Sequence, residues 1–124
     1  MAGRLDGRRI LVIDGDDQVR EVLAEALEAE GARVSRADRA ATALAGLAAG
    51  TVDAVVSDAD LPDAAGEALY AALCAADPAL ATRTLFLARD PLAPPARLLR
   101  TLTLVLPKPL ALSELVSALV GLLP

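Results

Sequence analysis

The sequence predicts an α/β fold: a doubly wound sheet of five parallel strands in the order 2-1-3-4-5, with five helices on its two faces. The chain has 124 residues, which suits one domain, because domains commonly run to about 100–150 residues. Short apolar, β-branched runs alternate with longer segments of helical periodicity, as in parallel sheets covered by helices. Aromatic residues make up only 2% of the chain, so Ala, Leu and Val must form the core.

The first two strand–helix pairs are predicted from apolar runs and their end signals. Residues 9–14 contain the run Ile10-Leu11-Val12-Ile13, which is typical of a central parallel strand. Residues 17–30 form a helix that ends at Gly31, and its apolar face holds Val19, Val22, Leu23, Ala26 and Leu27. Residues 33–37 alternate apolar and charged side chains, which favours an edge strand. Asp38 is expected to cap a weaker helix that extends to Gly50.

The other strands are short apolar runs separated by turn residues. They are predicted at residues 52–57, 84–88 and 103–106. A helix over residues 67–76 is expected to stop at Asp77-Pro78, because helices end before a proline. Pro94-Pro95 fit only the first turn of a helix, which predicts a helix near residues 96–102. Ser113 is expected to cap the last helix, with an apolar face of Leu115, Val116, Leu119 and Val120.

Composition and charge exclude several classes of function. The formal net charge of −5 argues against nucleic-acid binding, which needs a basic face. The chain has no histidine, which removes His-based triads and His-ligated zinc, and its single cysteine forbids an internal disulfide. No apolar stretch approaches the roughly 18 residues of a membrane span, and the polar N-terminus has no signal-peptide run. We therefore expect a cytoplasmic protein that binds neither nucleic acid nor membranes.

Residues that can carry chemistry follow three of the predicted strands at their carboxyl ends. Asp14 ends the first strand, Asp58 and Asp60 follow the third, and Lys108 follows the fifth. Open parallel sheets bind ligands beyond these ends, where the strand order reverses. The first and third strands are neighbours in the predicted order, so Asp14 and Asp58 should meet across a crevice that Lys108 can reach. Converging carboxylates need a cation among them, and such hard oxygen ligands suit Mg²⁺. A carboxylate beside Mg²⁺ and a lysine can be a nucleophile toward phosphorus.

Together these segments resemble the receiver domains of response regulators and hybrid sensor histidine kinases. The resemblance covers nearly the whole chain and rests on Ile10-Leu11-Val12-Ile13-Asp14, Asp17-Gln18-Val19-Arg20-Glu21-Val22-Leu23, Ser57-Asp58-Ala59-Asp60-Leu61-Pro62 with Gly66, and Pro107-Lys108-Pro109. The stretch from Phe86 to Pro109, with Val105 at the aromatic switch position, looks most like the C-terminal receivers of hybrid kinases. The resemblance implies a flavodoxin-like receiver domain over residues 8–124, with residues 1–7 as an N-terminal tail or linker stub.

The resemblance also implies a role for each matching residue. Asp58 resembles the phosphoacceptor and Lys108 the phosphoryl-sensing lysine. Asp14, Asp58 and the main-chain carbonyl of Asp60 match the positions that bind Mg²⁺. The implied partner is a sensor histidine kinase or a histidine phosphotransfer domain, which donates the phosphoryl group from a histidine. Such a domain is a phosphoacceptor in signalling rather than an enzyme.

Two positions depart from the family pattern. Gly15 stands where the family usually has a second acid that binds Mg²⁺, so we expect weaker Mg²⁺ binding unless Asp16 or water fills that place. Ala88 stands where a Ser or Thr hydrogen-bonds the phosphoryl group, and it cannot donate. Arg89, the next residue, could meet a phosphoryl oxygen instead.

Three functions remain open at this point. The first is a receiver phosphorylated on Asp58, and the second is a degenerate pseudo-receiver that binds partners without phosphate. The third is a phosphatase similar to the haloacid dehalogenases. Asp58-Ala59-Asp60 resembles the Asp-x-Asp motif of that family, although the family places its motif on the first strand of a longer chain. A nucleotide-binding module is disfavoured because no Gly-rich phosphate loop follows any strand. The sequence leaves open the kinase, the output, a homodimer through the last helix, and whether the chain acts alone or within a hybrid kinase.

Overall fold

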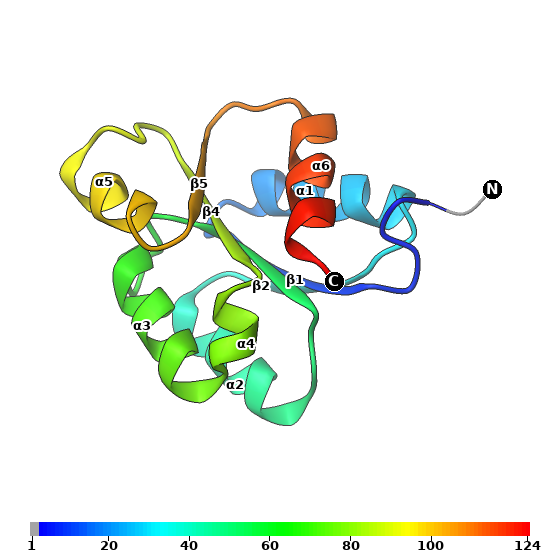
Figure 1. Cartoon of the computed structure of the whole chain (residues 1–124), viewed down its shortest axis with the longest axis horizontal. Helices are drawn as coiled ribbons and strands as arrows, with labels where there is room; N and C mark the ends of the chain where they lie inside the picture. The colour runs from blue at the N-terminus through cyan, green and yellow to red at the C-terminus, as the bar shows by residue number, and fades with distance from the viewer. Residues whose placement is uncertain (1–2) are drawn as a thin grey trace.

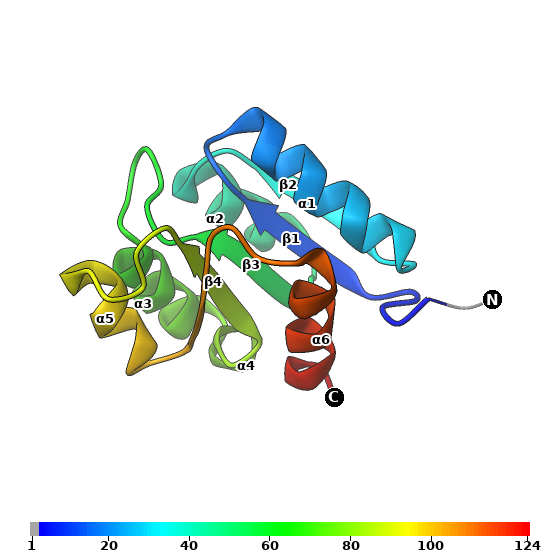
Figure 2. The same ribbon diagram turned by 90° about the horizontal axis from the view of Figure 1, so that it is seen from above.

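All five strands pair in one parallel sheet in the predicted order, β2-β1-β3-β4-β5. The computed structural model describes residues 3–124. The strands are β1 (Arg9–Ile13), β2 (Arg33–Ala37), β3 (Ala54–Asp58), β4 (Thr84–Ala88) and β5 (Leu104–Pro107). The sheet lies between two layers of helices, with α1 and α6 on one face and α2, α3 and α4 on the other (Figures 1 and 2). The flavodoxin-like fold is therefore confirmed, with β2 at an edge as its alternating sequence predicted.

Six helices are present in the described chain, one more than predicted. They are α1 (Asp17–Ala29), α2 (Ala40–Ala49), α3 (Gly66–Ala76), α4 (Pro78–Ala81), α5 (Pro94–Arg100) and α6 (Leu112–Leu122). The extra helix is α4, because Asp77 both ends α3 and caps a new turn, where its Oδ1 accepts from the Leu80 N–H at 3.1 Å. Pro78 therefore stops one helix and occupies the first position of the next. No helix within residues 3–124 is long and apolar enough to cross a membrane.

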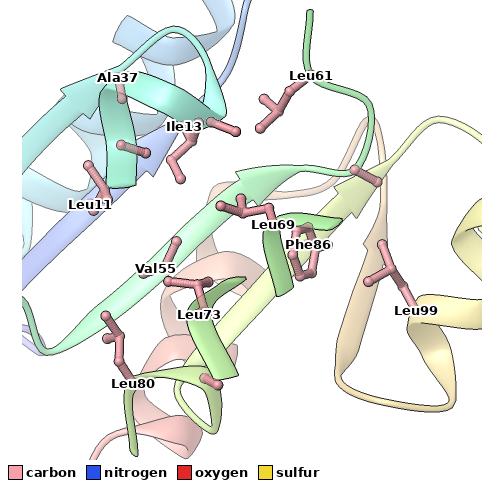
Figure 3. Packing of buried hydrophobic residues seen from close by; sticks show 14 of the residues in the cluster. Leu11, Ile13, Ala37, Val55, Leu61, Leu69, Leu73, Leu80, Phe86 and Leu99 are labelled. Carbon is pink, nitrogen blue, oxygen red and sulfur yellow. The ribbon is translucent and has the colours of Figure 1, made fainter. Parts of the chain in front are cut away.

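Side chains alternate between the two faces of the sheet along each strand and form two separate hydrophobic cores. On one face, Ile10, Val12, Val56 and Leu87 pack with α1 and α6. On the other face the strands pack with α2, α3, α4 and α5, and Figure 3 shows this cluster around Val55, Leu69, Leu73, Phe86 and Leu99. Leu122 and Leu123, at the end of the last helix that was considered as a homodimer surface, are partly buried against the α1–α6 core. Apolar burial on both faces fixes the strands, and therefore the loops at their carboxyl ends.

Several local predictions need correction. Asp38 does not cap α2, whose N-cap residue Arg39 makes no side-chain cap hydrogen bond. Ser113 lies inside α6 rather than at its cap. Val22 and Val120 are exposed on the helices whose apolar faces they were expected to join, because the buried stripe of each helix is narrower than its apolar sequence pattern.

The segment predicted to be a tail contains a buried side chain. Leu5 has no solvent exposure and packs into the core of α1 and α6. Its N–H donates to the Glu30 carbonyl at 2.9 Å, and the Arg8 guanidinium donates to the Pro124 carbonyl at 2.7 Å. These contacts connect the start of the described chain with the ends of α1 and α6.

The cap of α2 comes from the loop after β3. Asp63 accepts from the N–H groups of Ala40 at 2.8 Å and Ala41 at 3.0 Å. These two donors, chiefly Ala41 and then Ala40, lower the pKa of Asp63 below its ordinary value of 3.8. The helix start beside the site is therefore held by a carboxylate 22 to 23 residues away in sequence.

We predict that Asp63→Ala lowers the Tm at pH 7, because two N–H groups at the start of α2 lose their acceptor. Since the folded pKa is lowered, the stabilisation is present above pH 3.8 and is lost as the pH falls through the folded pKa. Thermal unfolding between pH 7 and 2 checks this, with Asp63→Asn as the variant that keeps one acceptor oxygen. Equal Tm values for wild type and Asp63→Ala at pH 7 would contradict the assignment.

Candidate functional site

The carboxyl edge of the sheet brings Asp14, Asp58 and Lys108 together. β1 and β3 are adjacent, with Ile13 opposite Ser57, so the next residue of each strand is an aspartate at the same level. β5 is held beside β4 with Pro107 opposite Ala88, and the Lys108 N–H donates to the Ala88 carbonyl at 2.8 Å. The sheet register therefore sets the position of all three side chains.

Asp14 is the buried carboxylate of this cluster. It is 1% exposed, and its Oδ1 accepts from the Asp16 N–H at 2.9 Å. Its Oδ2 accepts from Lys108 Nζ at 2.7 Å. Both carboxylate oxygens are thus engaged, as a buried charge requires.

Asp58 is the accessible member. Its side chain is 20% exposed, and Lys108 Nζ lies 3.6 Å from its Oδ1. The same oxygen faces the Asp60 N–H at 3.3 Å. Burial and the neighbouring charge of Asp14 raise the pKa of Asp58, while Lys108 opposes this shift. Lys108 therefore bridges two carboxylates but lies closer to the buried one.

The Asp60 side chain does not form a third converging carboxylate. Its side chain is exposed, and the turn after it is closed by a bridge between Asp60 and Ala65. Across residues 3–124, no three acidic, His or Cys side chains gather as metal ligands would. Two carboxylates with a nearby carbonyl still match Mg²⁺, which uses one or two carboxylates and keeps several waters. Asp14, Asp58 and the Asp60 carbonyl could hold that ion.

Asp16 and Asp17 serve the helix that follows. Asp16 Oδ1 accepts from the N–H groups of Gln18 at 2.9 Å and Val19 at 3.0 Å, which makes it the N-cap of α1. Asp17 pairs with Arg20 at 2.6 Å on the exposed side of that helix. The Asp16 side chain is therefore committed to the helix start, which disfavours it as the substitute for a second acid.

The two departures from the sequence pattern, Gly15 and Ala88, have different surroundings beside Asp58. A β carbon at Gly15 would lie 2.9 Å from Pro62 Cγ, so the loop after β3 has closed over the place of a side chain. Ala88 is buried and helps line a cavity beside Asp58, which we call the alanine-lined cavity. Its small residues are Ala59, Ala65, Ala88, Ala93 and Ala96. A second cavity, here the acidic cavity, contains Asp14, Gly15, Asp16, Asp58, Pro62 and Lys108.

Sequence reasoning missed these loop contacts. Pro62 against Gly15 and the alanine lining have no sequence signal, because alanine and proline bear no recognisable chemistry. The contact of Arg20 was also missed: its Nη1 donates to the Asp14 carbonyl at 2.9 Å. Its place one turn into the helix that follows Asp14 is a signal that could have predicted this contact.

Comparison with known proteins decides the family. The model of the response regulator receiver domain family matches residues 10–120. The chain belongs to this family. It is therefore a receiver domain of two-component signalling. Among curated protein sequences, none matches it.

Solved receiver domains share the fold over almost the whole chain. The HemR receiver domain from Leptospira biflexa, in its non-phosphorylated form, is 29% identical with a TM-score of 0.81, and 93% of each chain is covered. The chemotaxis response regulator CheY4 of Vibrio cholerae is 23% identical with a TM-score of 0.83, covering 94% of this chain and 99% of CheY4. TrrA from Thermotoga maritima, solved in complex with Mg(2+)-BeF, has the same identity, TM-score and coverage.

We predict that Lys108→Met lowers the free energy of unfolding by about 3–5 kcal/mol, because the buried Asp14 carboxylate loses its ion-pair partner. Methionine keeps the length and apolar stem of the lysine. The double variant Asp14→Asn/Lys108→Met should recover at least half of this loss, since no buried charge then remains. Urea denaturation at pH 7 measures both. A single variant as stable as wild type, or a double variant less stable than Lys108→Met, would show that the pair does not hold the site together.

Proposed function

We propose that this receiver domain accepts a phosphoryl group on Asp58 from the phosphohistidine of a sensor kinase or a histidine phosphotransfer domain. The observation that carries the proposal is the unequal exposure of the two carboxylates. Asp14 is 1% exposed and engaged on both oxygens, while Asp58 is 20% exposed and is the one of the two that lines both cavities. A donor can therefore reach Asp58 and not Asp14.

The proposed transfer is a single displacement at phosphorus. A carboxylate oxygen of Asp58 forms the new P–O bond, and the P–N bond to the donor histidine breaks, with the electron pair leaving on the imidazole. With acetyl phosphate as donor, a P–O bond breaks instead and acetate leaves. Lys108 Nζ, 3.6 Å from Asp58 Oδ1, lies close enough to neutralise an oxygen of the incoming group.

Mg²⁺ is the proposed cofactor. When bound, it would neutralise phosphoryl oxygens and hold them in line for attack. Asp14, Asp58 and the Asp60 carbonyl would hold the ion. Gly15 supplies no side-chain ligand, and Asp14 Oδ2 already accepts from Lys108 Nζ at 2.7 Å. We therefore expect Mg²⁺ affinity below that of a site with a third carboxylate.

The second candidate is a pseudo-receiver that binds its partner without phosphate. Ala88 favours it, because a buried alanine offers no hydroxyl that could pull on a phosphoryl group. Pro62 also favours it, because it packs where a second acid would begin. The two candidates share the fold and differ in whether Asp58 reacts.

We predict a covalent phosphoryl adduct when the purified chain is incubated with Mg²⁺ and acetyl phosphate. Intact-mass spectrometry detects it directly. Asp58→Asn should abolish the adduct, and Glu25→Gln, which removes an equal charge from an exposed position of α1, should leave it unchanged. No adduct in the wild type at high Mg²⁺, or an adduct that persists in Asp58→Asn, would sink the proposal, and the first of these results would favour the pseudo-receiver.

A further inference from the structure

A phosphoryl group on Asp58 would lack donors in the site described so far. It carries about two negative charges at neutral pH and three acceptor oxygens. Lys108 is shared with Asp14, which it contacts at 2.7 Å, against 3.6 Å for Asp58. Ala88 has no side-chain donor. Besides the proposed Mg²⁺, a working acceptor site here needs a second cationic side chain that can donate hydrogen bonds.

The cationic side chains at this edge of the sheet are nearly all engaged. Arg20 pairs with Asp17 and donates to the Asp14 carbonyl. Arg39 pairs with Asp38 at 3.4 Å, and Lys108 bridges the two aspartates. In the part of the chain that the structure describes, Arg89 forms no ion pair and its side chain donates no hydrogen bond. Its guanidinium is the free cation beside Asp58.

Arg89 lies where it can serve that role. It follows Ala88 directly at the end of β4 and lines both the alanine-lined cavity and the acidic cavity. Asp58 and Asp60 are the other residues common to both cavities. The capping N–H of Val19 chiefly lowers the pKa of Asp16, and Lys108 and Arg89 add to this, which agrees with a shared field at the site.

The backbone beneath Arg89 is fixed while its side chain is free. The Ala88 carbonyl accepts from the Lys108 N–H, which locks the end of β4 to the loop after β5. On the other side, the Asp90 side chain accepts from the Leu92 N–H at 3.0 Å and the Asp90 carbonyl from the Ala93 N–H at 3.2 Å. The Asp90 carboxylate is thus partly engaged within its own turn. The Arg89 side chain is exposed, while the backbone on both sides of it is held by hydrogen bonds.

We propose that Arg89 binds the phosphoryl group on Asp58 and takes the place of the hydroxyl that Ala88 lacks. This inference rests on the proposed function. A guanidinium presents paired N–H donors that match two phosphoryl oxygens, and it stays charged at any pH the domain meets. Arg89 also begins the loop that leads to α5 at Pro94, so the contact would bind that loop to the phosphorylated aspartate.

Beryllofluoride tests this contact without a donor or a leaving group, because it mimics a phosphoryl group on a carboxylate. We would measure its affinity by calorimetry with excess Mg²⁺ for wild type, Arg89→Ala, Arg89→Lys and Arg97→Ala. Arg97 is exposed on α5 and lines neither cavity, so its loss changes the net charge equally. We expect about tenfold weaker binding for Arg89→Ala, the loss of one charged hydrogen bond. Arg89→Lys should recover part of the affinity, and Arg97→Ala should match wild type.

Two further readings separate a phosphoryl contact from a merely structural effect. Mg²⁺ affinity without beryllofluoride should not fall in Arg89→Ala, because Arg89 lines the acidic cavity and the loss of a cation there favours a divalent ion. The Tm should be equal in wild type and Arg89→Ala. Wild-type binding that is undiminished in Arg89→Ala, or weakened equally in Arg97→Ala, would overturn the role of Arg89 and leave the proposed function standing. A wild-type chain that binds no beryllofluoride and forms no adduct with acetyl phosphate would overturn both.

Discussion

The contact between Lys108 and Asp14 is the interaction on which the rest of the site depends. A carboxylate that is 1% exposed is costly to keep charged unless a cation and hydrogen-bond donors compensate it. The Lys108 ammonium at 2.7 Å and the Asp16 N–H at 2.9 Å supply that compensation. This pair joins the end of β1 to the loop after β5, across a sheet in which two other strands lie between them. It also leaves Asp58 as the carboxylate that faces the solvent.

The charge balance around Asp58 follows from that arrangement. Two carboxylates share one lysine, and the position of a third acid is a glycine that Pro62 has closed over. The site is therefore less acidic than one with three carboxylates, which lowers its demand for a divalent cation. It is also poorer in donors, because Ala88 replaces a hydroxyl. The free guanidinium of Arg89 lines the same cavity as Ala88, where the hydroxyl donor is missing. The missing acid, the missing hydroxyl and the free arginine together define the charge and the donors around Asp58.

The sequence was sufficient to predict the sheet and the residues at its carboxyl edge, but not the side-chain and loop contacts that these residues make. Continuous apolar runs such as Ile10 to Ile13 identify buried strands because both faces are covered, and strand ends then locate Asp14, Asp58 and Lys108. Helix ends were harder, because the cap of α2 comes from Asp63 and the short α4 starts at a proline that also signals a stop. Lys108 lies closer to Asp14 than to Asp58 by about an ångström, and Pro62 contacts Gly15 through the packing of a loop. Neither feature can be predicted from the periodicity of the sequence.

We propose that Asp58, and not Asp14 or Asp60, is the carboxylate that reacts with phosphorus. Borohydride reduction of the chain after treatment with acetyl phosphate and Mg²⁺ converts an acyl phosphate into homoserine, which peptide mass spectrometry locates. Homoserine is expected at position 58 alone, because Asp14 is buried and Lys108 forms ion pairs with Asp14 and Asp58 rather than with Asp60 in the described chain. Homoserine at position 14 or 60, or unmodified aspartate at all three positions, would contradict it.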